Sequence, residues 1–557
     1  MRRPNARSPK PNSEIKSDPD PIMEPLSIKS FQFKQNPNSR SSSFSRIPKA
    51  QPKFNWVTVF FFPVAFVIVF YLSFVFLGQR TPENGRKFGI IIDGGSTGSR
   101  IHVFEYKVEG GVPRFDFGPD GHSSMRVNPG LSAFEDNPER AGESLLELLD
   151  FGKRIVPREL WGDTEVRLMA TAGLRLLDLE VQNRILESCR RLMRSSGLKF
   201  RDDWASVITG SDEGLYAWVV ANYALGTLGG DPHLTTGIIE LGGASAQVTF
   251  ASRESVPSEF SRSLNYGNVT YHLYSNSLLH FGQNVAFDTL KDLLVSSDIT
   301  LVLYKFPCAA TKSSEEELTM DPCTPKGYAE SINSFNLAPD SSAKKYLSTF
   351  HAAGNFSECR AAALKLLQRG KEGCAYDHCS LGATFMPKLH GRFLATENFF
   401  HTSQFFGLAS KAVLSDLMEA GQEFCEENWP NIRKKYSSLA EEDLLHYCFS
   451  SAYIVALLHD SLNIALDDTS IGYTNQVENV PLDWALGAFI LQTTAINEAN
   501  YGWISLISDN FPNSFLIMGA TILLTFAACY VSQWRKPYFK TIYDLEKGRY
   551  IITRINR

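Results

Sequence analysis

Several features that mark common protein classes are missing from this 557-residue chain. It has no Cys-x-x-Cys pair and no cluster of histidines, which argues against a zinc site. No small-residue cleavage site follows its first apolar run, at 54–77, and that run is too long and begins too late for a signal peptide. The chain is 43% hydrophobic, which excludes global disorder. Its length suggests two to four domains or lobes.

Charge is absent from two stretches, residues 54–77 and 514–531. A bilayer core needs about 20 apolar residues, so we interpret both runs as transmembrane helices, with a buried core helix as the alternative. Residues 1–53 hold 11 Lys/Arg against 4 Asp/Glu, and residues 532–557 hold 7 against 2. The positive-inside rule then predicts that both termini are cytoplasmic and that the acidic region between the runs is lumenal or extracellular.

The cysteines agree with an oxidising compartment. Cys529 lies in the second apolar run, and eight cysteines lie between the runs: Cys189, Cys308, Cys323, Cys359, Cys374, Cys379, Cys425 and Cys448. Oxidised pairs are favoured there, although spacing cannot choose among the many possible pairings. Two glycosylation sequons, Asn268-Val-Thr and Asn355-Phe-Ser, lie in the same region.

Strand and helix signals alternate between the apolar runs, which predicts the α/β class. Residues 89–93 are typical of a buried strand, and 100–106 alternate so that they could pair back as a hairpin. Helical spacing of apolar residues occurs at 138–156, 179–196, 212–225, 441–457 and 482–493. From 252 to about 388 the periodicity weakens and cysteines concentrate, which indicates disulfide-tied insertions. Residues 1–53 lack periodicity and are predicted to be a disordered basic tail.

One pattern occurs twice. "IIIDGGSTGSR" at Ile90–Arg100 and "GIIELGGAS" at Gly237–Ser245 each combine an apolar strand, an acid, a glycine pair and a hydroxyl. Glycine lets backbone N–H groups approach a phosphate closely and adopt positive φ, the hydroxyl adds a donor, and the acid can hold a divalent cation through water. Two ordinary hairpins would also have Gly-rich turns. Two copies with matching offsets favour a clamp around a phosphate chain.

These residues lead to a resemblance. The chain resembles the apyrase, or ecto-nucleoside triphosphate diphosphohydrolase, family of the actin–hexokinase superfamily, and most of all its plant membrane-bound members. Five family motifs occur in order over residues 93–488: "DGGSTGSR" at 93–100, "ATAGLRLL" at 170–177, "GSDEGLYAWVVANYALG" at 210–226, "ELGGASAQVTF" at 240–250 and "DWALGA" at 483–488. The resemblance implies a two-lobed, actin/hexokinase-like (ribonuclease H-like) ectodomain that hydrolyses nucleoside tri- or diphosphates.

The resemblance also implies a role for each matching position. Glu213 is the expected base that activates water, by direct attack, since no motif for phosphorylation of an aspartate is evident. The expected catalytic residues are Glu213, Ser245, Gln247 and Thr171. The expected phosphate-binding residues are Gly95, Ser96, Thr97, Gly98, Arg100, Arg175, Gly242, Gly243 and Ala244. The expected base-binding residues are Trp484 and Phe400, and the expected metal residues are Asp93 and Glu240, which would hold Ca²⁺ or Mg²⁺ through water. Relatives usually have Asp where this chain has Glu240.

Disulfides and domains follow from the same resemblance. The pairs Cys323–Cys359, Cys374–Cys379 and Cys425–Cys448 are expected, with Cys189 and Cys308 left open. The expected first lobe is 81–209 plus 475–505, and the second is 210–474. A metabolite kinase and a non-catalytic nucleotide-binding protein of the same fold remain alternatives. No nucleic-acid partner is expected, and the membrane could be that of the Golgi, an endosome or the cell surface.

Overall fold

The computed structural model describes residues 85–109, 112–115, 122–295, 319–328, 350–376, 379–408, 412–494, 538–544 and 546–555. Both apolar runs, the basic tail and Cys308 lie outside these ranges, so the predicted spans stay predictions. No helix among the described residues is long and apolar enough to cross a membrane. Strands β19 (Tyr538–Asp544) and β20 (Arg549–Ile555) form a separate antiparallel hairpin near the C-terminus.

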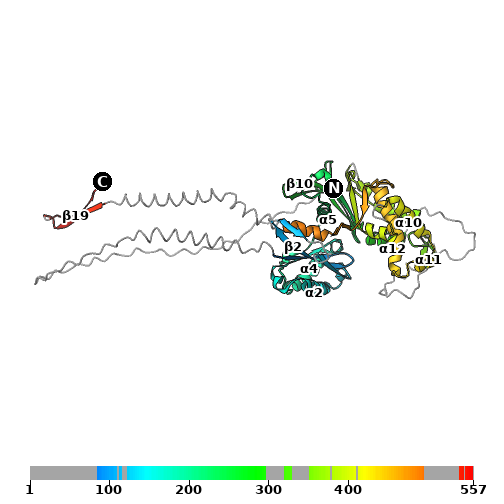
Figure 1. Ribbon diagram of the computed structural model, residues 1–557, viewed down its shortest axis with the longest axis horizontal. Coiled ribbons are helices and arrows are strands. Elements are labelled where there is room, and N and C mark those ends of the chain that lie inside the picture. The colour runs from blue at the N-terminus through cyan, green and yellow to red at the C-terminus, as the bar shows by residue number, and fades with distance from the viewer. Residues whose placement is uncertain are drawn as a thin grey trace, which may run out of the picture. The chain divides into compact units, whose positions relative to one another are not determined.

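Two six-stranded mixed sheets form the framework of the folded region (Figure 1). The first sheet has the order β3-β2-β1-β5-β6, with β4 on β2, and consists of β1 (Lys87–Gly94), β2 (Ser99–Glu109), β3 (Val112–Phe115), β4 (His122–Val127), β5 (Glu165–Ala170) and β6 (Ala205–Val207). The second has the order β16-β15-β7-β8-β10-β9 and consists of β7 (Gly237–Leu241), β8 (Ser245–Ala251), β9 (Ser261–Tyr266), β10 (Val269–Leu279), β15 (Phe393–Glu397) and β16 (Ile471–Tyr473).

The two sheets share a central topology. In the first, β1 pairs antiparallel with β2 and parallel with β5. In the second, β7 pairs antiparallel with β8 and parallel with β15. The doubled sequence motif is therefore a doubled structural unit, and the expected two-lobed α/β fold is confirmed.

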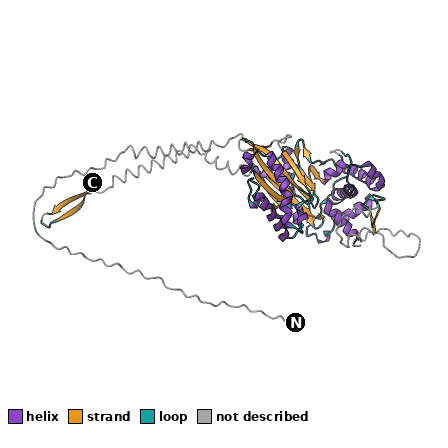
Figure 2. Ribbon diagram, turned by 90° about the horizontal axis from the view of Figure 1, so that it is seen from below, coloured by secondary structure: helices purple, strands orange, loops and turns teal. Residues whose placement is uncertain are grey.

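Helices fill three layers around the sheets, as Figure 2 shows with helices in purple and strands in orange. The outer face of the first sheet packs on α2 (Leu146–Ile155) and α4 (Leu179–Arg194). Between the sheets lie α5 (Gly210–Ala224) and the helical residues 484–494. The outer face of the second sheet packs on α6 (Gln283–Val295), α8 (Phe356–Leu367), α9 (Asn398–Phe405), α10 (Leu414–Glu426), α11 (Trp429–Lys435) and α12 (Glu441–Val455).

Strand periodicity sorts side chains between these layers. Ile90 and Ile92 pack in the outer core with α2 and α4, whereas Ile91 packs in the central core. Phe489, from the helical residues 484–494, stacks on Phe104 of β2 with ring centroids 4.7 Å apart. Residues 484–494 therefore contact the first sheet, although they follow the second sheet in sequence. The predicted lobe boundaries themselves stay predictions.

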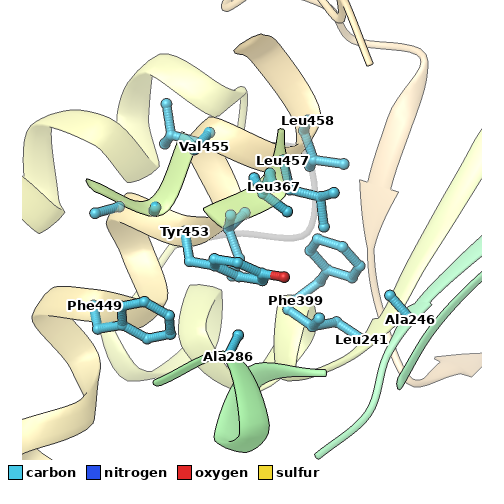
Figure 3. Packing of buried hydrophobic residues seen from close by; sticks show 14 of the residues in the cluster. Leu241, Ala246, Ala286, Leu367, Phe399, Phe449, Tyr453, Val455, Leu457 and Leu458 are labelled. Carbon is cyan, nitrogen blue, oxygen red and sulfur yellow. The ribbon is translucent and has the colours of Figure 1, made fainter. Parts of the chain in front are cut away.

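The core beneath the second sheet is rich in aromatic residues. Figure 3 shows Tyr453 and Phe449 of α12 beside Ala286 of α6 and Phe399 of α9. Tyr453 is fully buried, and its hydroxyl donates a hydrogen bond of 2.8 Å to the Phe281 carbonyl. Satisfying that polar group lets a tyrosine occupy the core without a desolvation penalty.

The three expected disulfides, Cys323–Cys359, Cys374–Cys379 and Cys425–Cys448, are all present. Cys189 is buried and has no disulfide partner among the described residues, which do not include Cys308.

Short elements complete the described fold. They are η1 (Leu131–Phe134), η2 (Pro138–Leu145), η3 (Arg158–Asp163), α3 (Ala172–Arg175), η4 (Asp202–Trp204), η5 (Pro232–Leu234), β11 (Thr319–Asp321), β12 (Phe350–Ala352), η6 (Lys371–Gly373), β13 (Cys379–Leu381), β14 (Thr384–Phe385), η7 (Ala456–Ser461), β17 (Gln476–Val477) and β18 (Val480–Pro481). The predicted helix at 138–156 is corrected: its first half, η2, is a 3-10 helix. Gly142 approaches α4 so closely there that its N–H donates to Ser188 Oγ at 3.1 Å.

Candidate active site

Both Gly-rich loops line one polar pocket among the described residues. It is lined by Asp93, Gly95, Ser96, Thr97, Gly98, Arg100, Arg126, Thr171, Ala172, Glu213, Glu240, Gly242, Gly243, Ala244, Ser245, Gln247, Glu397, Asp483 and Trp484. The two acids of the doubled motif, Asp93 and Glu240, therefore share one cleft. They lie at the carboxyl ends of β1 and β7, the edge at which ligands bind in many open α/β sheets.

The two acids have the same register position. Asp93 lies opposite Arg100 on β2, and Glu240 lies opposite Gln247 on β8, so each acid faces the residue seven positions later. Both acids therefore meet a polar side chain from the returning strand. The partner is a cation in the first copy and a neutral amide in the second.

Each acid has a buried oxygen, Asp93 Oδ1 and Glu240 Oε2, without a hydrogen-bond partner. Burial, together with the charges of Asp483 and Glu213, raises the pKa of Asp93 well above its ordinary value. Burial and the charge of Glu213 do the same to the pKa of Glu240. Unpartnered carboxylate oxygens in a buried acidic setting fit a divalent cation with hard oxygen ligands. No group of three or more His, Cys, Asp or Glu that could hold a metal ion occurs in the described part of the chain.

The loop glycines are needed for close approach. A Cβ on Gly243 would lie 2.8 Å from Ser96 Oγ, so the second loop touches the first at that point. A Cβ on Gly98 would lie 2.4 Å from Asn128 Oδ1. The expectation that the loop glycines adopt positive φ is wrong, because Gly95, Gly98 and Gly243 are not among the glycines with positive φ. The loops need glycine for space and not for left-handed backbone.

Glu213 lies in the first turn of α5 and turns into the cleft. Its neighbour Asp212 occupies the structural position, because the side chain of Thr209, the N-cap, accepts the Asp212 N–H at 3.1 Å and donates to Asp212 Oδ2 at 2.6 Å. The Glu213 residue is 9% exposed. Arg175 donates to Glu213 Oε2 at 2.6 Å. Burial raises the pKa of Glu213, and the Arg175 guanidinium opposes that shift without cancelling it.

Besides Arg175, neutral polar side chains surround this carboxylate. Gln247 Nε2 donates to Ser245 Oγ at 2.5 Å, to Ser277 Oγ at 3.1 Å and to Glu213 Oε2 at 3.4 Å. Arg175 also reaches Ser245 Oγ at 3.4 Å. Ser245 and Gln247 are both buried. A small polar molecule at this corner would meet a carboxylate, a hydroxyl and an amide together.

The opposite side of the cleft is cationic. Arg100 donates to Asp483 Oδ2 at 3.2 Å, and Arg126 donates to Thr97 Oγ1 at 2.6 Å. His102 Nε2 lies 3.4 Å from the same Asp483 oxygen. Burial alone would raise the pKa of Asp483, but His102 and Arg100 outweigh burial and hold it below its ordinary value. Burial lowers the pKa of His102 to about 4, so this imidazole is neutral at pH 7.

The structure brings most of the predicted site residues to this pocket. Trp484 lines it and stacks on Tyr216, with ring centroids 6.5 Å apart. Arg175 and Phe400 are not among the lining residues, and Arg175 contacts the Glu213 carboxylate instead.

Four lining residues were not predicted as site residues: Arg126, Ala172, Glu397 and Asp483. Asp483 and Ala172 belong to recognised motifs, so their motif membership could have identified them. Glu397 lies three residues before Phe400, in a stretch where only an aromatic residue was expected to have a role. Nothing in the sequence around Arg126 indicated a site.

Comparison with known proteins defines the class. Residues 79–505 match the model of the GDA1/CD39 (nucleoside phosphatase) family. The chain is 51% identical over 578 residues to "Probable apyrase 6" of Arabidopsis thaliana, with both chains covered in full. It is 28% identical to bovine "Ectonucleoside triphosphate diphosphohydrolase 1", over 75% of this chain and 83% of that protein.

A solved structure shares the fold. The crystal structure of nucleoside triphosphate hydrolases from Neospora caninum matches with a TM-score of 0.54 at 16% identity, over 78% of this chain and 97% of that chain. The similarity to the solved structure speaks for the fold alone. The family match and the identity to the plant relative show that the chain belongs to the apyrase (nucleoside triphosphate diphosphohydrolase) family of nucleoside phosphatases.

Proposed function

We propose that this chain is a membrane-anchored apyrase, which hydrolyses nucleoside tri- and diphosphates to the monophosphate and phosphate by direct attack of water. Glu213 is the base. The observation that carries the proposal is the position of the Glu213 carboxylate: it is buried, points into the cleft shared by both Gly-rich loops, and lies beside Ser245 and Gln247.

The reaction needs a positioned water and a base in line with the phosphoanhydride bond. Ser245 and Gln247 orient the water, and Glu213 Oε accepts its proton as the water oxygen bonds to the terminal phosphorus. The bridging P–O bond breaks, and its electron pair leaves with the shortened nucleotide. Burial favours this role because a carboxylate with a raised pKa is a stronger base than an exposed one.

The phosphate chain lies between the loops, where Ser96, Thr97 and the backbone N–H groups near Gly95, Gly98, Gly242, Gly243 and Ala244 can donate to its oxygens. Arg100 adds positive charge, Arg175 orients Glu213, and Thr171 lies beside the terminal phosphoryl group. Asp93 and Glu240 would hold a divalent cation, Ca²⁺ or Mg²⁺, through water, and the cation would neutralise charge on the phosphoryl oxygens. Trp484 stacks on the nucleobase, with Phe400 as the second aromatic.

The replacement Glu213→Gln tests this proposal. It keeps the shape and removes the basicity, so we expect kcat to fall about 10²–10⁴-fold while nucleotide binding persists. Asp212→Asn is the matched control, since it alters the adjacent capping carboxylate and should leave kcat within about threefold. Phosphate release is measured on purified full-length protein with several nucleoside tri- and diphosphates. Near wild-type turnover by Glu213→Gln removes this residue from the mechanism.

The same assay separates the alternatives. A metabolite kinase would release little free phosphate, and an acceptor would increase formation of the shortened nucleotide without increasing phosphate release, because the phosphoryl group goes to the acceptor. A non-catalytic binding protein would bind nucleotide and release no phosphate at all. We expect one phosphate released for each phosphoanhydride bond broken, and no change in that ratio or in the rate when a sugar or metabolite acceptor is added.

The membrane anchoring is a separate part of the proposal. Residues 54–77 and 514–531 span a bilayer, both termini are cytoplasmic, and the catalytic region is lumenal or extracellular, in the secretory pathway or at the cell surface. In this arrangement 81–209 with 475–505 form one lobe, and 210–474 form the other. The three disulfides support an oxidising compartment.

Glycosylation tests the topology at one residue. Asn268 is exposed in the turn between β9 and β10, whereas the Asn355 side chain caps α8 by accepting the Glu358 N–H at 3.1 Å. We expect glycan on Asn268 and little on Asn355. Glycosidase treatment should therefore shift the wild type and the Asn355→Gln variant but not the Asn268→Gln variant. An unglycosylated Asn268 in protein from a secretory host would contradict the lumenal placement.

A further inference from the structure

We propose that Glu397 binds the ribose hydroxyls of the nucleotide and is the residue by which this site selects nucleotides over a bare phosphate chain. The inference rests on the proposed function, because it assigns a further residue to the same cleft. It starts from a carboxylate that the mechanism leaves unused and that the fold holds in an unfavourable backbone conformation.

Glu397 lies in the cleft where a parallel strand of the second sheet ends, one register position before the equivalent of Thr171, since Ala170 is the residue opposite Gly94. It is the last residue of β15, opposite Leu241 of β7, and it lines the cleft. It is also the N-cap residue of α9, as Thr171 is the N-cap residue of α3 in the first lobe. Both copies thus place one side chain in the cleft where a parallel strand enters a helix. The first copy has a hydroxyl there and the second has a carboxylate.

The backbone of Glu397 is strained. Its φ is 59° and its ψ is −120°, a combination that glycine adopts readily and a residue with a side chain does not. Two contacts hold the turn: the Glu397 N–H donates to Asn475 Oδ1 at 2.7 Å, and Asn398 Nδ2 donates to the Leu241 carbonyl at 2.8 Å. Strain of this kind persists where surrounding structure enforces it, and such positions cluster at ligand-binding sites. A glycine would form the turn without strain, so the carboxylate itself is what the strained position provides.

The charges around Glu397 locate it along the cleft. Burial raises the pKa of Glu397 most. The charge of Asp483, the residue before Trp484, raises it further, whereas Arg100 and Arg126 lower it. Arg126 is bonded to Thr97 at the phosphate end. The charge of Glu397 also acts on Asp93 and Glu240. Its backbone ties it to the segment of Trp484, because the Glu397 N–H is bonded to Asn475 and the Asn475 carbonyl accepts the Leu482 N–H, so Glu397 lies between the cation and phosphate groups and that segment. In a nucleotide, that intermediate position is the sugar.

The chemistry of a carboxylate favours the same assignment. A negative side chain repels phosphate oxygens, so within the nucleotide its partner must be a neutral donor. The vicinal 2′- and 3′-hydroxyls offer two donors to the two oxygens of one carboxylate, which is the way an Asp or Glu reads the ribose 2′-hydroxyl in dinucleotide-binding folds. Asp483 is less suited, because it already accepts from Arg100 and from the Ala485 N–H.

Substrates that differ only in the sugar test the proposal. We would compare kcat and KM for ATP, 2′-deoxy-ATP, 2′,3′-dideoxy-ATP and inorganic tripolyphosphate with wild type, Glu397→Gln and Glu397→Ala. The wild type should prefer ATP over the dideoxy analogue by about tenfold or more in kcat/KM. Both variants should lose most of that preference through a higher KM for ATP, with kcat little changed. Glu419→Gln, an exposed carboxylate on α10, is the control that should keep the preference.

A stability measurement separates ligand binding from a structural role. Glu397→Gly relieves the strained turn and removes the carboxylate, so its thermal midpoint should rise while the ribose preference disappears. Glu397→Ala keeps the strain but, like Glu397→Gly, loses the buried charge, so the thermal midpoint of Glu397→Gly should exceed that of Glu397→Ala. A Glu397→Gly variant that is less stable than wild type would show that the residue serves the fold, against the proposal.

Other outcomes are equally decisive. A wild type that hydrolyses ATP and the dideoxy analogue equally well overturns the ribose assignment. An equal loss for ATP and tripolyphosphate in the variants would mean that Glu397 acts on the phosphate or cation end. If the variants lose activity only toward guanine nucleotides, as a comparison of GTP with ITP would show, Glu397 contacts the edge of the nucleobase. If the wild type hydrolyses no nucleotide, the proposed function itself has failed, which is distinct from a failure to discriminate sugars.

Discussion

The two strand–turn–strand units, β1–β2 and β7–β8, share register but differ in what surrounds them. In the first unit, Arg100 and Arg126 surround the loop, and their partners are Asp483 and Thr97. In the second unit, the corresponding side of the loop carries neutral groups, with Gln247 bonded to Ser245 and Ser277.

The difference indicates a division of labour within a duplicated scaffold. Both units bring an acid to the cleft, and this shared feature suits a cation held between them. The cationic side suits a chain of phosphate charges. The neutral side can orient water without adding a second cation beside Arg175, which already contacts Glu213 and opposes the rise in its pKa. Duplication thus supplies the symmetric part of the chemistry, and divergence of the facing strand supplies the asymmetric part.

Removing either acid tests the shared feature and should have the largest effect. Asp93→Asn and Glu240→Gln keep shape and remove charge, so we expect each to lower kcat/KM by about 10²-fold or more. The pKa of both groups is raised in the folded state. Their charged forms therefore destabilise the fold at pH values above the ordinary carboxyl pKa. The thermal midpoint measured in chelator should therefore stay the same or rise.

Cation binding gives a readout that is independent of turnover. Addition of Ca²⁺ or Mg²⁺ should raise the thermal midpoint of the wild type, by mass action on the folded state, and should not raise that of either variant. Asp150→Asn, an exposed carboxylate on α2, is the control and should respond like the wild type. If the cation raises the thermal midpoint of Asp93→Asn as much as that of the wild type, the two acids do not share the role of holding the cation. Glu240→Asp should retain the cation response, because it keeps a carboxylate at this position.

The cross-strand partners of the two acids test the asymmetric part. Arg100→Met and Gln247→Met replace equivalent positions with side chains of similar length. We expect Arg100→Met to raise KM about tenfold, since it removes charge from the phosphate side. We expect Gln247→Met to lower kcat about 10- to 100-fold with little change in KM, since it removes a group that orients water. The same KM and kcat pattern in both variants would contradict a division of labour.

The sequence predicts those parts of the site whose residues lie close together in the chain. The acid, glycines and hydroxyl of each loop lie within ten residues of one another, so their spacing carries the signal. Glu213 was reached through its place in the family motif at 210–226, because helix position alone fits an ordinary acidic residue in the first turn equally well.

The remaining contributions depend on pairings that are distant in sequence. Glu397 enters the cleft through parallel pairing of β15 with β7, about 155 residues earlier, and through a backbone turn that no propensity predicts for Glu. Arg126 enters through β4, which pairs with β2 as an off-path strand. Gly142 of η2 contacts Ser188 of α4, a residue distant in sequence, and the apolar periodicity of 138–156, which predicts an α-helix, carries no information about that contact.

The smallest expected effect concerns the contact between Arg175 and Glu213. Arg175 follows β5 of the first sheet, and its guanidinium opposes the rise that burial gives to the pKa of Glu213. Arg175→Met removes that opposing charge, so the pKa of Glu213 should rise further. A base must be deprotonated to act, and the acid limb of the kcat–pH profile should therefore move to higher pH, with a plateau within about tenfold of wild type. Arg175→Lys keeps the charge and should leave the limb closer to its original position. The profile is measured at saturating substrate, so that it reports the bound enzyme. A limb that stays in place in Arg175→Met would mean that another group titrates there, and that the contact between Arg175 and Glu213 does not tune the base.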